Sequence, residues 1–234
     1  MKELSRRGMI GGFVTGVAAS LPILSASCAE GNKAEVSMPA APPLKTYKNE
    51  DFYGADGKLD VAKAKQAYYE MMDHYRYPIP PKLKTDEFWT LDFGMGKFTE
   101  LGMAGIFWIN ELEGDYFGHE IYLLPGQMIP EHKHVKTEKA GPKMEGWHVR
   151  HGWVYVYAEG EPTAGVEARI PPSHKECCKS KVETKLMPGE VATLAGAEQW
   201  HRMLAGPEGA IVSEYATFHD NDGLRFSHPD VKFP

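Results

Sequence analysis

The sequence has few cysteines and lacks a run of charge of one sign. Only 3 of its 234 residues are cysteine, and two of them, Cys177 and Cys178, are neighbours. With no Cys-x-x-Cys spacing, a zinc-ribbon or thioredoxin-like site is excluded. The 26 basic and 32 acidic residues are scattered along the chain, which argues against nucleic acid or an anionic membrane surface as a partner. A small neutral or polar ligand suits this surface better.

The sequence also lacks an apolar stretch suited to a permanent membrane span. Lys2, Arg6 and Arg7 precede a short apolar stretch, 8–24, that is interrupted by glycines and Pro22, so residues 1–29 are predicted to be an export signal. The arginine pair resembles a twin-arginine signal, which sends folded proteins across the bacterial inner membrane, and an ordinary secretory signal is the alternative. Both place the mature protein in the periplasm. Cys28 leaves a lipid anchor open.

The remaining chain divides into a helical extension and a β-rich domain. Residues 30–85 are predicted to be a linker followed by an amphipathic helix that Asp60 caps and that ends before Pro78, because apolar residues recur there at three- and four-residue steps. From residue 86 to 234 the pattern changes to short apolar runs separated by Gly, Pro or Asn. The expected strands are 104–109, 118–124, 147–158, 182–186, 190–194 and 210–217. This pattern predicts an all-β domain, either a sandwich or a closed barrel.

Two histidines separated by one residue, His132 and His134, are the first sign of a functional site. On a strand this spacing sends both imidazoles to the same face, because side chains alternate. Two adjacent imidazoles supply half of a metal site. Alone the pair would favour an interpretation as exposed or hydrogen-bonded histidines, but further histidine and glutamate residues follow downstream, around Glu145 and His201.

These residues together resemble the cupin family over about 120–217. Its first motif contains Gly, five residues, His-x-His, then Glu, six residues and Gly; its second ends in a histidine. The matching residues are Gly126, His132, His134, Glu145 and Gly152, followed by Gly189, Gly196 and His201. The resemblance implies a single-domain, jelly-roll-like β-barrel with a metal bound by His132, His134, Glu145 and His201. It also leaves a homodimer open.

The sequence departs from the cupin pattern in the gap before the glutamate. Ten residues separate His134 from Glu145, so Glu138 has the family spacing from His134, whereas Glu145 has the family spacing to Gly152. We favour Glu145, because the residues after it read as the next strand. The insertion 137–143 is then expected to extend a hairpin at the mouth of the barrel.

Three imidazoles and one carboxylate are borderline-to-hard ligands. Mn²⁺ is the expected ion, and Zn²⁺, Fe²⁺, Co²⁺ or Ni²⁺ are also compatible. If the ion is octahedral, four protein ligands leave two positions for a chelating substrate.

The sequence around the metal motifs resembles one family more specifically, the D-lyxose isomerase family. The resemblance rests on Lys136 after the His-x-His pair, on Lys-Met-Glu145, and on the ending from Ser213 to Phe226. Ser213 occupies a position where that family has glycine, and the Asn-Asp residues are shifted along the sequence relative to the family's pattern. The resemblance implies a metal-dependent aldose-ketose isomerase that acts through an enediol on a free sugar such as D-lyxose or D-mannose.

Isomerisation moves one proton between two carbons, so it needs a base beside them and a Lewis acid on the adjacent oxygens. Glu214, on the last predicted strand, is the expected base, and Lys136 is expected to polarise the sugar oxygens. Arg225 and Trp147 are the expected substrate-binding residues. Two other functions stay open: an iron-dependent cupin dioxygenase with the same ligands, and a non-catalytic periplasmic sugar-binding cupin.

Overall fold

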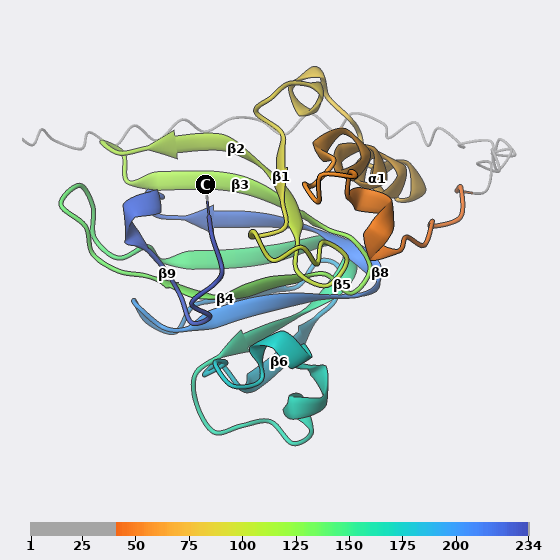
Figure 1. Cartoon of the computed structure of the whole chain (residues 1–234). Helices are drawn as coiled ribbons and strands as arrows, with labels where there is room; N and C mark the ends of the chain where they lie inside the picture. The colour runs from red at the N-terminus through yellow and green to blue at the C-terminus, as the bar shows by residue number, and fades with distance from the viewer. Residues whose placement is uncertain (1–40, 234) are drawn as a thin grey trace, which may run out of the picture. The chain divides into compact units, whose positions relative to one another are not determined.

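The computed structural model describes residues 41–233 (Figure 1). Its strands are β1 (Trp89–Leu91), β2 (Met103–Glu111), β3 (Tyr116–Leu123), β4 (Met128–His134), β5 (Glu145–Ala158), β6 (Val182–Leu186), β7 (Val191–Thr193), β8 (His201–Ala216) and β9 (Leu224–Phe226). The α-helix of these residues is α1 (Val61–His74), and short 3-10 helices span Asn49–Phe52, Pro81–Lys84, Val166–Arg169, Pro172–His174 and Asn221–Gly223.

The nine strands form one curled sheet whose two long strands each belong to two layers. The carboxyl-terminal part of β8 pairs with β3, and β3 continues to β2 and β1. The amino-terminal part of β8 pairs with β4, which continues to β9. Along its whole length β8 also pairs with β5, whose two ends bind β7 and β6. The two layers enclose one apolar core between them.

Two glycines lie opposite each other where β5 and β8 pass from one layer to the other. Gly152 and Gly209 both have positive φ, at 64° and 71°, a conformation that other residues rarely adopt. A Cβ on Gly152 would come within 2.0 Å of the Gly209 carbonyl oxygen. The register of the β5–β8 pair shifts on either side of this point, as expected where a paired strand bends through a bulge.

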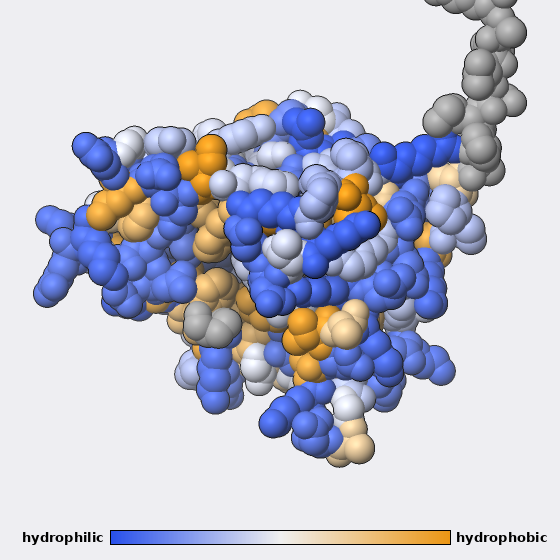
Figure 2. All heavy atoms as spheres, turned by 90° about the horizontal axis from the view of Figure 1, so that it is seen from above, coloured by the Kyte–Doolittle hydropathy of each residue, from blue (hydrophilic) through white to orange (hydrophobic). Residues whose placement is uncertain are grey.

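Helix α1 covers the outer face of the layer that contains β2 and β3. It begins where the Asp60 side chain accepts the Lys63 backbone N–H, a standard N-cap bond. Its apolar face, including Tyr68, Met71 and Met72, packs in a second core with Ile106 and Tyr122. The opposite face of the helix is polar. Figure 2 shows that the surface seen from above is mostly hydrophilic, with small apolar patches. No helix of the described residues is long and apolar enough to cross a membrane.

The structure confirms the predicted all-β barrel with a helical extension, and the bounds of the predicted elements are close to those observed. The main difference is β8, which is predicted over 210–217 and observed over His201–Ala216, because Gly206, Pro207 and Gly209 read as a turn but lie at a bend in a paired strand. Strands β1 and β9, three residues each, and β4 are not among the expected strands. The export signal 1–29, the lipid anchor at Cys28 and the start of the linker lie outside the described residues.

Candidate active site

A pocket between the two layers has one polar side and otherwise apolar walls. Its polar lining residues are His119, His132, His134, Lys143, Glu145, His201, Arg202, Glu214 and His219. The apolar walls include Phe93, Phe107, Phe117 and Phe226. Since apolar walls exclude water, charges gathered on the polar side interact more strongly than they would at the surface.

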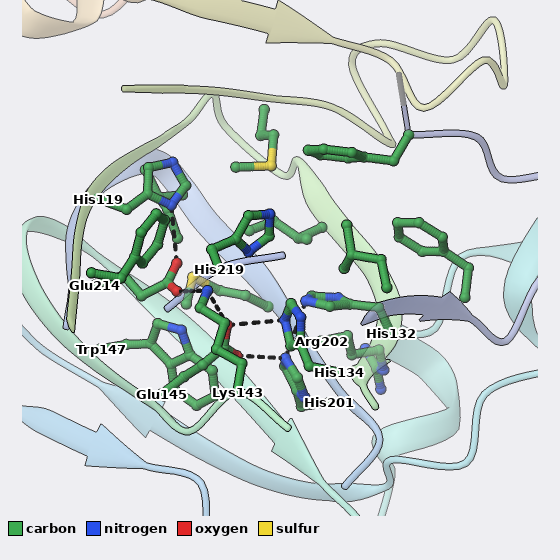
Figure 3. A pocket seen from close by; sticks show the side chains of 18 of the residues that line it. His119, His132, His134, Lys143, Glu145, Trp147, His201, Arg202, Glu214 and His219 are labelled. Atoms are coloured by element: carbon green, nitrogen blue, oxygen red, sulfur yellow. Dashed lines mark hydrogen bonds and ion pairs between the residues drawn. The ribbon is translucent and has the colours of Figure 1, made fainter. Parts of the chain in front are cut away.

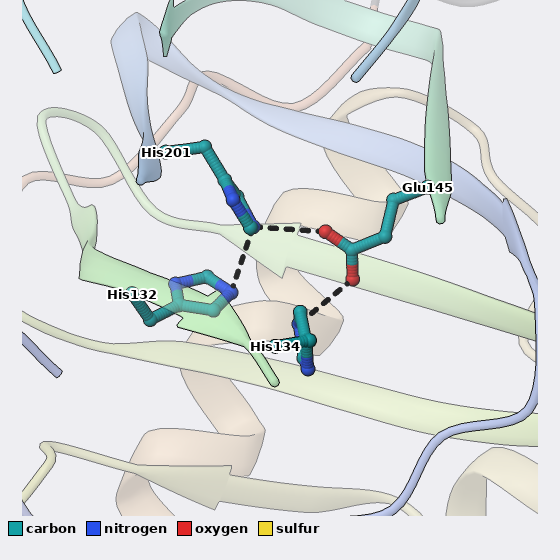
Figure 4. Close-up of side chains that lie close together, drawn as sticks. All are labelled: His132, His134, Glu145 and His201. Carbon is teal, nitrogen blue, oxygen red and sulfur yellow. Dashed lines mark hydrogen bonds and ion pairs between the residues drawn. The ribbon is translucent and has the colours of Figure 1, made fainter. Parts of the chain in front are cut away.

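Four of these residues converge, and they are the four that the sequence predicts as metal ligands. One ligand atom from each of His132, His134, Glu145 and His201 lies within 4.8 Å of the others (Figure 4). His132 and His134 come from one face of β4, and His201 is the cross-strand partner of His132 on β8. The Glu145 carboxylate, at the start of β5, lies 3.0 Å from His134 Nε2 and 2.8 Å from His201 Nε2.

Two of the imidazoles point their Nε2 atoms at each other. His132 Nδ1 lies 2.9 Å from the Pro130 carbonyl and His201 Nδ1 lies 2.9 Å from the Gln199 carbonyl. A carbonyl only accepts, so each Nδ1 carries a proton, which leaves Nε2 as the nitrogen that can bind a metal. These two Nε2 atoms are 3.1 Å apart. Ligand atoms about 2.1 Å from a common ion are roughly 3 Å apart when adjacent. The residues therefore fit a divalent metal.

The structure brings Glu145, and not Glu138, to the imidazoles. Glu138 is exposed, whereas Glu145 is 5% exposed and contacts two histidines and Lys143. Burial works against the charged form, but Lys143 and the imidazoles of His134 and His201 hold the pKa of Glu145 well below its usual range. Glu145 therefore remains a carboxylate, the form that binds a metal.

A second carboxylate, Glu214 on β8, lies beyond Lys143. The Lys143 ammonium bridges the two acids: its Nζ is 2.6 Å from Glu145 Oε1 and also donates to Glu214 Oε1 (Figure 3). The other oxygen of Glu214, Oε2, is 3.0 Å from His119 Nδ1. Burial works against ionisation, but Lys143 and His119 hold the pKa of Glu214 below its usual range. Glu214 is thus a buried, charged carboxylate facing the pocket.

Two of the other predicted site residues, Lys136 and Arg225, lie away from the pocket, and the third, Trp147, both lines the pocket and packs in the inner core. Lys136 and Arg225 are exposed and do not line the pocket, so the structure does not bring them to the other predicted site residues. Lys136 follows His134 at the end of β4, where the chain leaves the barrel, and the Arg225 guanidinium donates to the carbonyls of Asp222 and Leu224. Trp147 lines the pocket beside His201, with ring centroids 5.4 Å apart, and also belongs to the inner core.

Sequence reasoning missed four polar side chains of the pocket: Lys143, His119, Arg202 and His219. Lys143 lies at the end of the insertion 137–143, which we expected to be only a hairpin extension. Its spacing of two residues from Glu145 was the available signal, since alternate residues of an extended chain share a face. His119 and His219 carried no signal of their own, because their neighbours are known only once the strands are paired.

No protein-family model matches the chain. Among curated proteins, it is 32% identical over 175 residues to the D-lyxose/D-mannose isomerase of Thermosediminibacter oceani, covering 75% of this chain and 94% of that protein. It is 37% identical over 142 residues to the D-lyxose ketol-isomerase of Cohnella laeviribosi, covering 60% and 76%.

Among solved structures, the chain resembles two L-ribose isomerases. For that of Cellulomonas parahominis with L-ribose, the TM-score is 0.57 at 15% identity, with 72% of this chain and 91% of the other covered. For that of Acinetobacter sp. DL28 with L-ribose, the TM-score is 0.58 at 15% identity, with 77% and 95% covered. At this identity the likeness concerns the fold. Because the sequence match to the Thermosediminibacter protein spans nearly all of that protein, the chain belongs to the D-lyxose isomerase family of sugar isomerases.

Proposed function

We propose that this protein is a metal-dependent aldose-ketose isomerase that converts free D-lyxose or D-mannose to the corresponding ketose through an enediol. His132, His134, Glu145 and His201 would hold the ion, with Mn²⁺ expected and Zn²⁺, Fe²⁺, Co²⁺ or Ni²⁺ compatible. The observation that carries the proposal is the pairing of this donor set with a second buried carboxylate, Glu214, across Lys143.

An aldose and its ketose have the same atoms. The carbon-bound hydrogen at C2 of the aldose moves as a proton to C1, and the hydroxyl proton on O2 moves to O1. When bound, a divalent ion supplies a Lewis acid for the adjacent oxygens, which carry negative charge as the carbon-bound proton leaves.

Glu214 is the residue that we assign to the carbon-bound proton. Its charge state suits a base, because Lys143 and His119 keep it ionised in spite of burial. It takes the proton from C2 and returns it to C1, and the apolar walls of the pocket keep water from exchanging with it.

Lys143 takes the place that the sequence assigned to Lys136. Its ammonium lies between Glu145 and Glu214 (Figure 3), so it separates two negative charges that would otherwise repel inside the barrel. Its ammonium has three N–H donors, so one remains for a sugar oxygen that binds beside the two carboxylates.

Two observations favour this function over an iron-dependent dioxygenase or a non-catalytic sugar-binding protein. The curated relatives are named as D-lyxose isomerases, and neither alternative has a use for a buried carboxylate held by a lysine and a histidine beside the ligand set.

The test is ketose formation by the purified chain after metal removal and reloading with each compatible ion. We expect D-xylulose from D-lyxose and D-fructose from D-mannose, with activity lost on chelation and restored by Mn²⁺. Glu214→Gln should abolish turnover with unchanged metal content, and the exposed Glu138→Gln is its matched control. Absence of ketose from every sugar and ion would refute the proposal.

Export to the periplasm through residues 1–29 is part of the proposal for where the reaction occurs. Fusing residues 1–29 to a reporter that is active only after export would test it. A homodimer and a lipid at Cys28 stay predictions, to be measured by light scattering and mass spectrometry of the protein purified from its host.

A further inference from the structure

His119 is a buried histidine that lies beside Glu214 but outside the predicted ligand set. It is the cross-strand partner of Glu214 in the β3–β8 pair, so both side chains leave the same face of the sheet. His119 Nδ1 lies 3.0 Å from Glu214 Oε2, and both residues are nearly inaccessible, at 6% and 4% exposure (Figure 3). A carboxylate oxygen accepts, so the proton of the imidazole is on Nδ1.

The surroundings of the ring force the same tautomer. His119 Nε2 is buried and has no hydrogen-bond partner. A proton on that nitrogen would be a buried donor without an acceptor, which is costly. The tautomer with the proton on Nδ1 is therefore the one that matches the surroundings of both ring nitrogens.

The imidazole occupies a space that the chain leaves open at Gly105. A Cβ on Gly105 would come within 2.3 Å of His119 Nε2 and 2.6 Å of the Trp89 ring. Trp89 stacks on the imidazole with an interplanar angle of 29°, and Phe107 contacts it edge-on at 4.9 Å between centroids. With β2 behind it and aromatic rings around it, the imidazole has one orientation.

The two oxygens of Glu214 are thus held from two sides. Lys143 donates to Oε1 and His119 donates to Oε2. One donor alone leaves the carboxylate free to turn about its terminal bond, whereas donors on both oxygens fix its plane. Each oxygen has two lone pairs, so one on each remains for proton exchange.

We propose that His119 is a positioning residue, whose Nδ1–H holds Glu214 in the plane from which it exchanges a proton with the sugar, in the space that Gly105 leaves for its ring. This inference rests on the proposed role of Glu214 as the base. His119 acts through Glu214 and does not itself touch the reacting carbons.

The test compares His119→Asn with His119→Phe. The amide nitrogen of asparagine can stand where Nδ1 stands, so His119→Asn keeps a donor for Oε2; phenylalanine keeps a ring beside Trp89 and has no donor. We expect His119→Phe to lower kcat about 10- to 100-fold, the usual loss when an orienting partner is removed, with little change in KM or metal content. His119→Asn should recover most of this loss.

The pH profile of kcat separates positioning from a packing defect. The titratable groups facing Glu214 are His119 on β3, Lys143 just before β5, Glu145 at the start of β5, and His219 after β8. Loss of a donor to the carboxylate favours its protonated form. The acidic limb of the kcat profile should therefore move to higher pH in His119→Phe and stay near the parent's in His119→Asn.

Two outcomes would overturn the inference while leaving the proposed function intact. In one, Glu214→Gln is inactive but a folded, metal-replete His119→Phe has the parent's kcat and pH profile. In the other, ¹⁵N NMR of the parent enzyme finds the His119 proton on Nε2, a measurement that stands even if a variant does not fold. Full activity of Glu214→Gln would instead refute the assigned base, and the role of His119 with it.

Discussion

The two faces of the layer formed by β2, β3 and β8 differ in the hydrogen bonding of their buried polar atoms. On the outer face, under α1, the buried side-chain amide of Gln127 is hydrogen-bonded at both its oxygen and its nitrogen. Tyr68 Oη and the Leu124 N–H donate to its Oε1, and its Nε2 donates to the Phe98 carbonyl. On the inner face, His119, His134 and His219 each keep at least one buried nitrogen without a partner.

This difference indicates which face serves folding and which serves chemistry. Buried polar groups without partners are costly, and three histidines that line the pocket carry such atoms. The outer face should respond to mutation in stability, and the inner face in activity and metal content.

The largest effect is expected at the inner face, from Glu145→Gln. The variant loses the carboxylate that contacts His134 and His201, so it should retain little metal and less than about a thousandth of the parent's kcat/KM, a loss of roughly 4 kcal/mol in transition-state stabilisation. Metal content by atomic emission and the rate of ketose formation are the readouts. Glu138→Gln is the control, and equal metal retention in the two variants would contradict the assigned ligand set.

Lys143→Met should come next. Removing the ammonium leaves the carboxylates of Glu145 and Glu214 facing each other without a cation, which raises the pKa of at least one of them. We expect kcat to fall about 100-fold or more, the size of a lost charge-assisted contact in a dry site. Lys136→Met changes an exposed lysine outside the pocket and should stay within about twofold of the parent. The opposite ranking of the two variants would restore Lys136 as the functional lysine.

Met71→Ala tests the other side of the comparison. Met71 is fully buried in the core under α1, and truncating such a side chain destabilises a protein by about 2–5 kcal/mol. Urea unfolding should show this loss, while kcat at 25 °C should remain that of the parent, since the substitution is on the face away from the pocket. A large fall in kcat with little loss of stability would break the division between the two faces.

The smallest expected effect is the pH dependence of the unfolding free energy that His174 contributes. This residue belongs to neither face of the layer. Burial lowers the pKa of His174 from 6.5 to about 4, with His228 and Arg202 adding to the effect. Between these two pH values the unfolded chain binds a proton that the folded chain does not, so stability falls as the pH falls from about 6.5 to about 4, by about 1–3 kcal/mol in total. His174→Asn should show a shallower fall in urea midpoint over this range, and parallel curves would be inconsistent with the assigned pKa.

The sequence predicted what depends on local pattern. Helix α1 follows from the spacing of its apolar residues and the Asp60 cap, and the shared face of His132 and His134 follows from strand alternation. His119 was beyond such reasoning, because it meets Glu214 across a pairing of strands 95 residues apart. Lys136 is the lysine that the resemblance indicates, because it closely follows the His-x-His pair. The insertion 137–143 makes distance along the chain from that pair a poor guide to position in the barrel.

The bend at Gly152 and Gly209 also bears on how the protein folds. Because β5 and β8 run through both layers, neither layer can be completed without the other. His132 and His201, which meet at the site, are 69 residues apart, and contacts of such long range are typical of slow, cooperative folding. The proposed metal site should therefore arise only in the final step of folding, so that the rate at which a refolding chain gains metal affinity measures the closure of the whole barrel.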